Sequence, residues 1–258
     1  MRFATPDGRE KHDPSRNNAV AAANYRGMRR SKISTTMRAA LLASALATSP
    51  AHAAGAQFTV DPEAGNSAFT AVFDAAIGER ITAVSSAVGC TIEADEAKLV
   101  GSAKCSVPLT SIRVDNDETK SEHFAEWATN KTSEPKSCRL ELAISSLKLE
   151  PPVEPKKPIA FSTEGRFTIC GRPRDDGGAE RITGTIVDLP AGTYGDARTL
   201  RIRARIEGFD RERYGVSPKN TAGWRARVQQ LAPVVATEGT IEVNLFATAP
   251  AAAETKAE

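Results

Sequence analysis

The 258-residue sequence has no long hydrophobic run and is poor in aromatic residues, which make up 5% of the chain. No apolar segment approaches the roughly 18–20 residues that a helix needs to cross a bilayer, which excludes a polytopic helical membrane protein. Hydrophobic residues still make up 40% of the chain and charged residues 26%. This composition is ordinary for a folded protein and excludes wholesale disorder.

The sequence also lacks the motifs of several common enzyme classes. It has no GxSxG motif to supply a nucleophilic serine, and neither GxGxxG nor GxxxxGK[ST] to bind a nucleotide. His123 is the only histidine beyond residue 53, and we expect a structural role for it. No CxxC pair is present, although zinc sites need clustered Cys and His ligands. We therefore predict no enzyme activity, no metal and no resident cofactor.

Basic residues are concentrated at the start of the chain. Residues 1–53 contain nine Lys and Arg against three Asp and Glu, which leaves 25 basic and 29 acidic residues in the remainder. The basic pI thus belongs to this leader, and it does not indicate nucleic acid as a partner.

Part of the leader has the organisation of an export signal. The basic segment Met28–Lys32 precedes an Ala- and Leu-rich run at Ala39–Ala47, and Ala51 and Ala53 form the A-x-A pattern of signal-peptidase sites. A buried Ala-rich helix is the alternative. We expect export through the inner membrane to the periplasm, with cleavage near Ala53.

These signals divide the chain into four parts. We expect 1–27 to be a disordered extension or a misassigned start, and 28–53 to be the signal peptide. The folded domain is expected at 54–248, followed by a disordered tail at 249–258.

The four cysteines all lie in the expected folded domain: Cys90, Cys105, Cys138 and Cys170. An even number of cysteines in an exported chain favours disulfides. The first two are equidistant from an acidic turn, and the last two from the middle of a Pro-rich connection. Residues equidistant from a hairpin turn face each other, so we predict disulfides 90–105 and 138–170. Cys170 is out of phase with the apolar positions before it, which predicts a β-bulge there.

Beyond the leader, apolar residues recur at every second position. The clearest alternation is found in the segments 68–73, 139–144, 159–169, 200–206 and 241–245. This is the pattern of half-buried strands in antiparallel sheets. The strands are too many for one small open sheet, and closure removes exposed edges. The sequence therefore predicts an all-β fold, an extended antiparallel barrel.

Two segments depart from the alternation. Residues 116–130 lack it and include Phe124 and Trp127, which predicts a short helix. Residues 219–237 fit a loop or a short helix. We therefore expect one or two short helices beside the strands.

Four stretches of the chain carry motifs in a recognisable order. They are Val107–Ile112 with Lys120–Phe124 and Pro135, then Gly165–Gly171, Gly208–Val216, and Thr240–Ala247. Together they resemble the YceI-like family of periplasmic polyisoprenoid-binding proteins, whose motifs are RDxHL followed by a proline, GxLTxxG and inRsdFGi. The resemblance covers residues 58–247.

The chain departs from the family pattern at several positions. Lys120-Ser121 replaces Arg-Asp, Glu126-Trp127 replaces an aromatic pair, and the four cysteines and the 219–237 segment are additional. The resemblance implies a lipocalin-like barrel of about eight strands that holds one isoprenoid lipid, of quinone or polyprenyl type. It also places His123 and Phe124 at the mouth of the pocket.

The phase of the strands predicts which side chains face the lumen. They are Phe69, Phe73, Leu140, Ile144, Phe161, Phe167, Ile202, Ile206, Val243 and Leu245. Two interpretations stay open at this point. The lumen is a tunnel for a slim hydrocarbon, or these side chains fill it and the protein is a disulfide-stabilised structural or interaction module.

Arg201, Arg203 and Arg205 form a basic stripe on the opposite face of their strand. The stripe is either a solvated outer face or a surface for transient contact with anionic membrane headgroups. We expect the protein to be a monomer or a homodimer.

Overall fold

The computed structural model describes residues 55–220 and 235–250. The strands are β1 (Ala56–Val60), β2 (Ala68–Ala75), β3 (Arg80–Ser85), β4 (Gly89–Asp95), β5 (Val100–Pro108), β6 (Arg113–Val114), β7 (Arg139–Lys148), β8 (Pro158–Ile169), β9 (Arg172–Pro173), β10 (Glu180–Leu189), β11 (Thr199–Asp210) and β12 (Val235–Thr248). Among the described residues there are one α-helix, α1 (Glu118–Thr129), and four 3-10 turns, η1 (Ala76–Gly78), η2 (Leu109–Ser111), η3 (Arg211–Tyr214) and η4 (Pro218–Asn220). The expected extension at 1–27 and the expected signal peptide at 28–53 lie outside the described residues, as do most of the segment 219–237 and of the expected tail.

Eight strands form a closed antiparallel ring, in the order β1-β4-β5-β7-β8-β10-β11-β12. The long strand β12 closes the ring, because it pairs with β11 along most of its length and with β1 at Thr248. Its first part pairs with β2 on the side away from β11. Strands β2, β3 and β6 continue the sheet beyond β12. The prediction of an all-β antiparallel barrel of about eight strands is confirmed.

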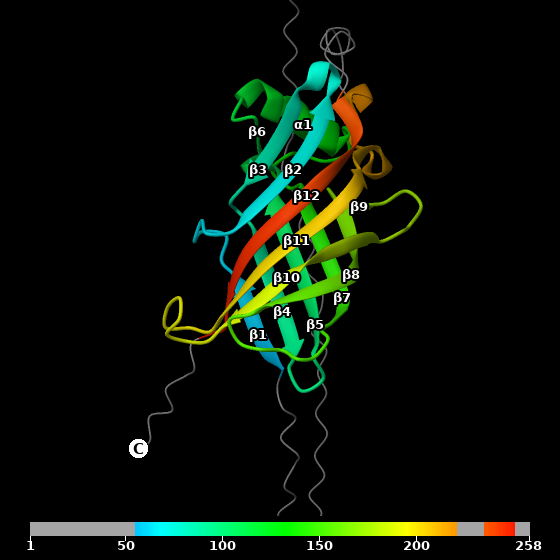
Figure 1. Cartoon of the computed structure of the whole chain (residues 1–258). Coiled ribbons are helices and arrows are strands. Elements are labelled where there is room, and N and C mark those ends of the chain that lie inside the picture. Colours follow the sequence, from blue (N-terminus) through cyan, green and yellow to red (C-terminus); the bar gives the residue numbers. More distant parts are fainter. Residues whose placement is uncertain (1–54, 221–234, 251–258) are drawn as a thin grey trace, which may run out of the picture. The chain divides into compact units, whose positions relative to one another are not determined.

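The two ends of the barrel differ (Figure 1). Helix α1 and strand β6 lie together with β3 at one end, which we call the helix end. The β4–β5 turn and the β10–β11 connection lie at the opposite end, which we call the far end. The helix end is therefore covered by a separate element, whereas the far end is bounded by loops between strands.

The alternating segments of the sequence form strands β2, β7, β8, β11 and β12. Along β8, Phe161, Gly165, Phe167 and Ile169 are buried, while the residues between them are mostly exposed. Successive side chains of a strand point to opposite faces, so the apolar positions line the lumen.

Helix α1 begins and ends with recognisable caps. The Asp117 side chain accepts a hydrogen bond from the Lys120 backbone N–H at 2.9 Å, which is the usual N-cap arrangement. Asn130 adopts the left-handed conformation at the other end and donates its backbone N–H to the Glu126 carbonyl. The helix expected within 116–130 is therefore present.

Both predicted disulfides are present, Cys90–Cys105 and Cys138–Cys170. Cys90 lies directly opposite Cys105 in the β4–β5 ladder. The bulge expected at Cys170 is not found. Strand β8 ends one residue earlier, and Cys170 starts a turn with a φ of 51°. This left-handed turn rotates the Cys170 side chain into reach of Cys138, so the strand needs no extra residue.

Candidate functional site

Two cavities lie inside the barrel. The first, which we call the barrel chamber, has a volume of about 100 Å³ and is lined by strands of the closed ring together with Phe69 of β2. The second, which we call the helix-side chamber, has a volume of about 290 Å³ and is lined by β2, β3, α1 and their neighbours. A cavity of roughly 10–15 Å³ can hold a water molecule, so both chambers have space for part of a ligand.

All ten residues predicted to face the lumen line one or both chambers. Those lining the barrel chamber are Phe69, Leu140, Ile144, Phe161, Phe167, Ile202, Ile206, Val243 and Leu245. Phe73 lines the helix-side chamber, as do His123 and Phe124 from the pocket-mouth motif. The structure thus brings together side chains from five strands and one helix around a single lumen.

The barrel chamber is apolar apart from Ser102 and Ser106. Two glycines in its wall make room for large neighbours. A Cβ at Gly165 would lie 2.6 Å from Ile182 Cδ1, and one at Gly184 would lie 2.8 Å from Phe161 Cζ. A larger residue at Gly165 would displace side chains that form the wall, and one at Gly184 would also clash with the Arg203 backbone carbonyl. An apolar cavity of this kind favours hydrocarbon over water.

The helix-side chamber adds polar groups to an apolar wall. Glu79, Lys120, His123 and Arg211 line it beside Phe124 and other apolar side chains. Lys120 Nζ lies 2.7 Å from Asp115 Oδ2, and this hydrogen bond raises the pKa of Lys120. Polar groups are therefore gathered at the helix end of the lumen.

Arg211 is a buried cation at this end, with a side chain that is 6% exposed. Its guanidinium donates hydrogen bonds to the carbonyls of Val216 at 2.6 Å, Val235 at 3.0 Å and Ala236 at 3.1 Å. It also lies 5.8 Å from the centre of the Trp127 ring. Burial lowers the pKa of Arg211, and the three carbonyls compensate for the water that it loses.

Arg198 holds the far end of the barrel together. Its Nε and Nη2 atoms each lie 2.9 Å from an oxygen of Asp188, and its Nη1 binds Glu96 in the β4–β5 turn. The hydrogen bonds to Asp188 raise the pKa of Arg198. The guanidinium also stacks over buried Phe58, 5.5 Å from the ring centre. Arg198 of the β10–β11 connection thus forms a bidentate ion pair with Asp188 of β10 and binds the β4–β5 turn through Glu96.

Several lining residues were not found by sequence reasoning. Ile182 and Ile186 of β10 line the barrel chamber. Ile182 stands between the polar residues Arg181 and Thr183, and this alternation could have predicted an inward-facing strand. Trp127 and Arg211 line the helix-side chamber, but no periodicity marks them. Arg211 lies in a charged stretch that appears solvent-exposed in the sequence.

The basic stripe lies on the outside of the barrel. Arg203 and Arg205 border an outer groove, and Arg205 lies within 3.6 Å of Glu242 and 3.4 Å of Glu207. Arg201 lies over the Phe246 ring at 5.6 Å. The stripe therefore does not contribute to the lumen.

The described part of the chain has neither a cluster of metal-binding side chains nor a membrane-spanning helix. No three His, Cys, Asp or Glu side chains gather there as a metal site. No helix in residues 55–220 and 235–250 is long and apolar enough to span a membrane.

A closed antiparallel barrel with an apolar lumen that is polar at one end is a lipocalin-like fold with an internal cavity. A solved structure with the same fold is a polyisoprenoid-binding domain from Saccharophagus degradans, described as implicated in plant cell wall breakdown. The two share 12% sequence identity with a TM-score of 0.52, over 76% of this chain and 99% of that chain. The fold implied by the resemblance to the YceI-like family is thereby confirmed.

The sequence comparisons are negative. No family model matches the sequence, and no curated protein matches it.

Proposed function

We propose that the protein is an exported lipid-binding protein that holds an isoprenoid chain, of quinone or polyprenyl type, in the barrel lumen for transport, storage or stress protection. The observation that carries the proposal is the lumen, an apolar barrel chamber that adjoins a chamber with polar groups at the helix end. An isoprenoid lipid has the matching form, with a slim hydrocarbon chain and one polar end. Each buried CH₂ group contributes about 0.8 kcal/mol, so a few isoprene units offset the cost of association.

The fold and the disulfides support this proposal. The structural neighbour is named for polyisoprenoid binding, and binding in the lumen requires no catalytic group. Two disulfides among the described residues fit an oxidising compartment such as the periplasm.

Packing in the middle of the lumen supports a second candidate function. Phe69, Leu140, Phe167 and Ile241 line both chambers, and each is at most 5% exposed. Side chains therefore occupy the middle of the lumen. This packing favours a disulfide-stabilised interaction module without a ligand.

Organic extraction of the exported protein, purified without detergent, distinguishes the lipid-binding function from the interaction module. Mass spectrometry of the extract should detect an isoprenoid in an amount comparable with the protein. A mock purification from cells that lack the protein is the control. An extract with no more isoprenoid than the mock would favour the interaction module.

A further inference from the structure

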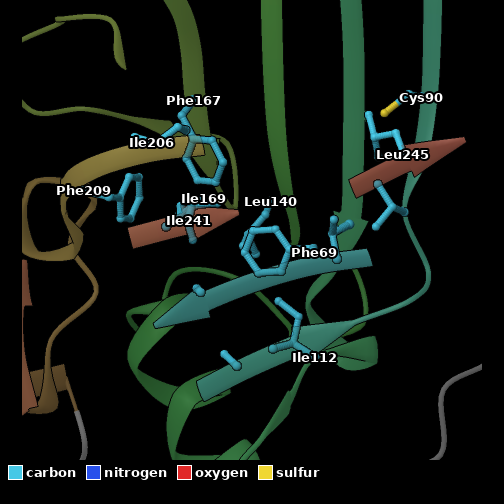
Figure 2. Close-up of a cluster of buried hydrophobic side chains, with 14 of the residues drawn as sticks. Phe69, Cys90, Ile112, Leu140, Phe167, Ile169, Ile206, Phe209, Ile241 and Leu245 are labelled. Atoms are coloured by element: carbon cyan, nitrogen blue, oxygen red, sulfur yellow. The ribbon is translucent and has the colours of Figure 1, made fainter. Parts of the chain in front are cut away.

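Four side chains separate the two chambers, and we call them the girdle. Phe69 comes from β2, Leu140 from β7, Phe167 from β8 and Ile241 from β12, and these four line both cavities. Figure 2 shows all four within one cluster of buried hydrophobic side chains. A chain that enters from the helix-side chamber must pass the girdle to reach the barrel chamber.

The two aromatic members of the girdle are held differently. The Phe167 ring makes edge contacts with Phe209 at 5.1 Å and with Tyr214 at 5.6 Å between ring centres. Rotation of Phe167 would break both contacts. Phe69 has no ring contact in the part of the chain that the structure describes. Phe69 is therefore the aromatic member whose rotation would break no ring–ring contact among the described residues.

The backbone at Phe69 also lies near the end of its ladder. Phe69 pairs with Val243 of β12, and the ladder between these strands ends one residue later, at Ala68 and Asn244. Strand β12 then pairs with β1 at Thr248. Backbone at the end of a ladder opens more readily than backbone in its middle. Just beyond the ladder, the buried Ser67 hydroxyl accepts a hydrogen bond from the Phe246 backbone N–H at 3.1 Å. Phe69 thus lies at the last paired positions of β2, with its ring in the girdle.

We propose that Phe69 sets the length of hydrocarbon chain that the lumen accepts. With the ring across the lumen, a ligand places its polar end and first isoprene units in the helix-side chamber, and its tail stops at the girdle. When the ring turns aside, the tail continues into the barrel chamber. The inference rests on the proposed function, because it assigns a specificity-determining residue to that binding site.

The chain also provides a matched control. Phe58 is 1% exposed, compared with 3% for Phe69, and it lines neither chamber. Phe58→Leu and Phe69→Leu remove the same atoms from equally buried positions. Only Phe69→Leu opens the girdle. A difference in lipid binding between the two variants therefore reflects access to the barrel chamber and not a general loss of stability.

The experiment offers a choice of chain lengths. The full-length wild-type protein and each variant are incubated with phosphatidylcholine vesicles that contain equal amounts of farnesol, geranylgeraniol and solanesol. These alcohols carry three, four and nine isoprene units. The protein is then re-isolated, and the bound alcohols are quantified by mass spectrometry.

Phe69→Leu should raise the ratio of bound solanesol to bound geranylgeraniol by about tenfold or more, since each further buried isoprene unit adds several CH₂-sized groups. Phe69→Trp, which adds volume to the girdle, should lower that ratio, and Phe58→Leu should leave it unchanged. An unchanged ratio in both Phe69 variants, or an equal change in Phe58→Leu, would overturn the inference while leaving lipid binding intact. Failure of the wild-type protein to bind any of the three alcohols would overturn the proposed function and this inference with it.

Discussion

Tyr214 and Glu180 are 34 residues apart in the chain, and the Tyr214 hydroxyl donates a hydrogen bond to Glu180 Oε1 over 2.6 Å. Both side chains are buried, at 1% and 6% exposed. The Tyr214 ring stacks on Phe209 with ring centres 4.9 Å apart and contacts Phe167 of the girdle. This hydrogen bond therefore anchors the aromatic cluster beside both chambers.

Tyr214→Phe should destabilise the protein by about 1–3 kcal/mol, because it removes a donor from a buried carboxylate. Denaturant-induced unfolding measures this loss. Tyr194→Phe is the matched control. Tyr194 is 58% exposed, so its change should stay within about 0.5 kcal/mol. Equal effects of the two substitutions would contradict the anchoring role.

Alkaline pH should weaken the fold through the same tyrosine. Burial, with the hydrogen bond to Glu180, raises the pKa of Tyr214 above its ordinary value. The unfolded chain ionises near pH 10, whereas the folded protein keeps the hydroxyl protonated. The contribution is therefore complete below about pH 10 and is lost as the pH rises further.

The difference in unfolding free energy between wild type and Tyr214→Phe isolates this effect. That difference should shrink when measurements at about pH 9 and pH 11 are compared. A difference that stays constant over this range would show that Tyr214 ionises normally in the folded protein, and one that grows would show that folding lowers its pKa.

The two disulfides should differ in their contributions to stability. Cys90–Cys105 closes a loop of 15 residues and Cys138–Cys170 one of 32. Loop-closure entropy predicts losses of about 3 and about 4 kcal/mol when each pair is replaced by alanine. Thermal unfolding of the two double variants would show which disulfide contributes more to stability. The comparison is matched, because each pair consists of one buried and one half-buried cysteine. A greater loss for the 90–105 pair would contradict this account.

Enlarging a lumen side chain tests whether the barrel chamber serves the ligand. Phe161→Trp and Ile202→Trp should reduce the binding of an isoprenoid long enough to pass the girdle, while the fold tolerates the added volume. In a fully packed core, the same changes would cost about 1–3 kcal/mol. Unchanged binding together with a lowered melting temperature would therefore reject the tunnel.

Arg203→Glu is the outward-facing control for these variants. Arg203 is exposed on the outer face of β11, so its reversal should affect neither packing nor the lumen. If this change abolished binding, the lipid headgroup would dock on the basic stripe outside the barrel.

The strands that form the barrel chamber were predictable because their side chains alternate with a period of two. Ile202 and Ile206 face inward while Arg203 faces outward, as the sequence pattern requires. The facing positions of Cys90 and Cys105 followed from equal distance to a turn. Local sequence patterns were therefore sufficient to predict both the inward-facing residues and this disulfide.

The helix-side chamber was less predictable, because it depends on which distant segments meet. Trp127 of α1 and Arg211 of η3 come together only through the tertiary fold. The position of Cys170 was misjudged for a local reason. The strand ends before it, and a left-handed turn at Cys170 and Gly171 redirects its side chain.

The central claim is that the lumen holds an isoprenoid lipid, and the mass of the intact folded protein tests it most directly. Native mass spectrometry of the full-length protein, purified without detergent, should give a species heavier than the polypeptide by the mass of one isoprenoid. That adduct should disappear on unfolding and should be depleted in Ile202→Trp. A folded wild-type protein with only the mass of its polypeptide would contradict the claim.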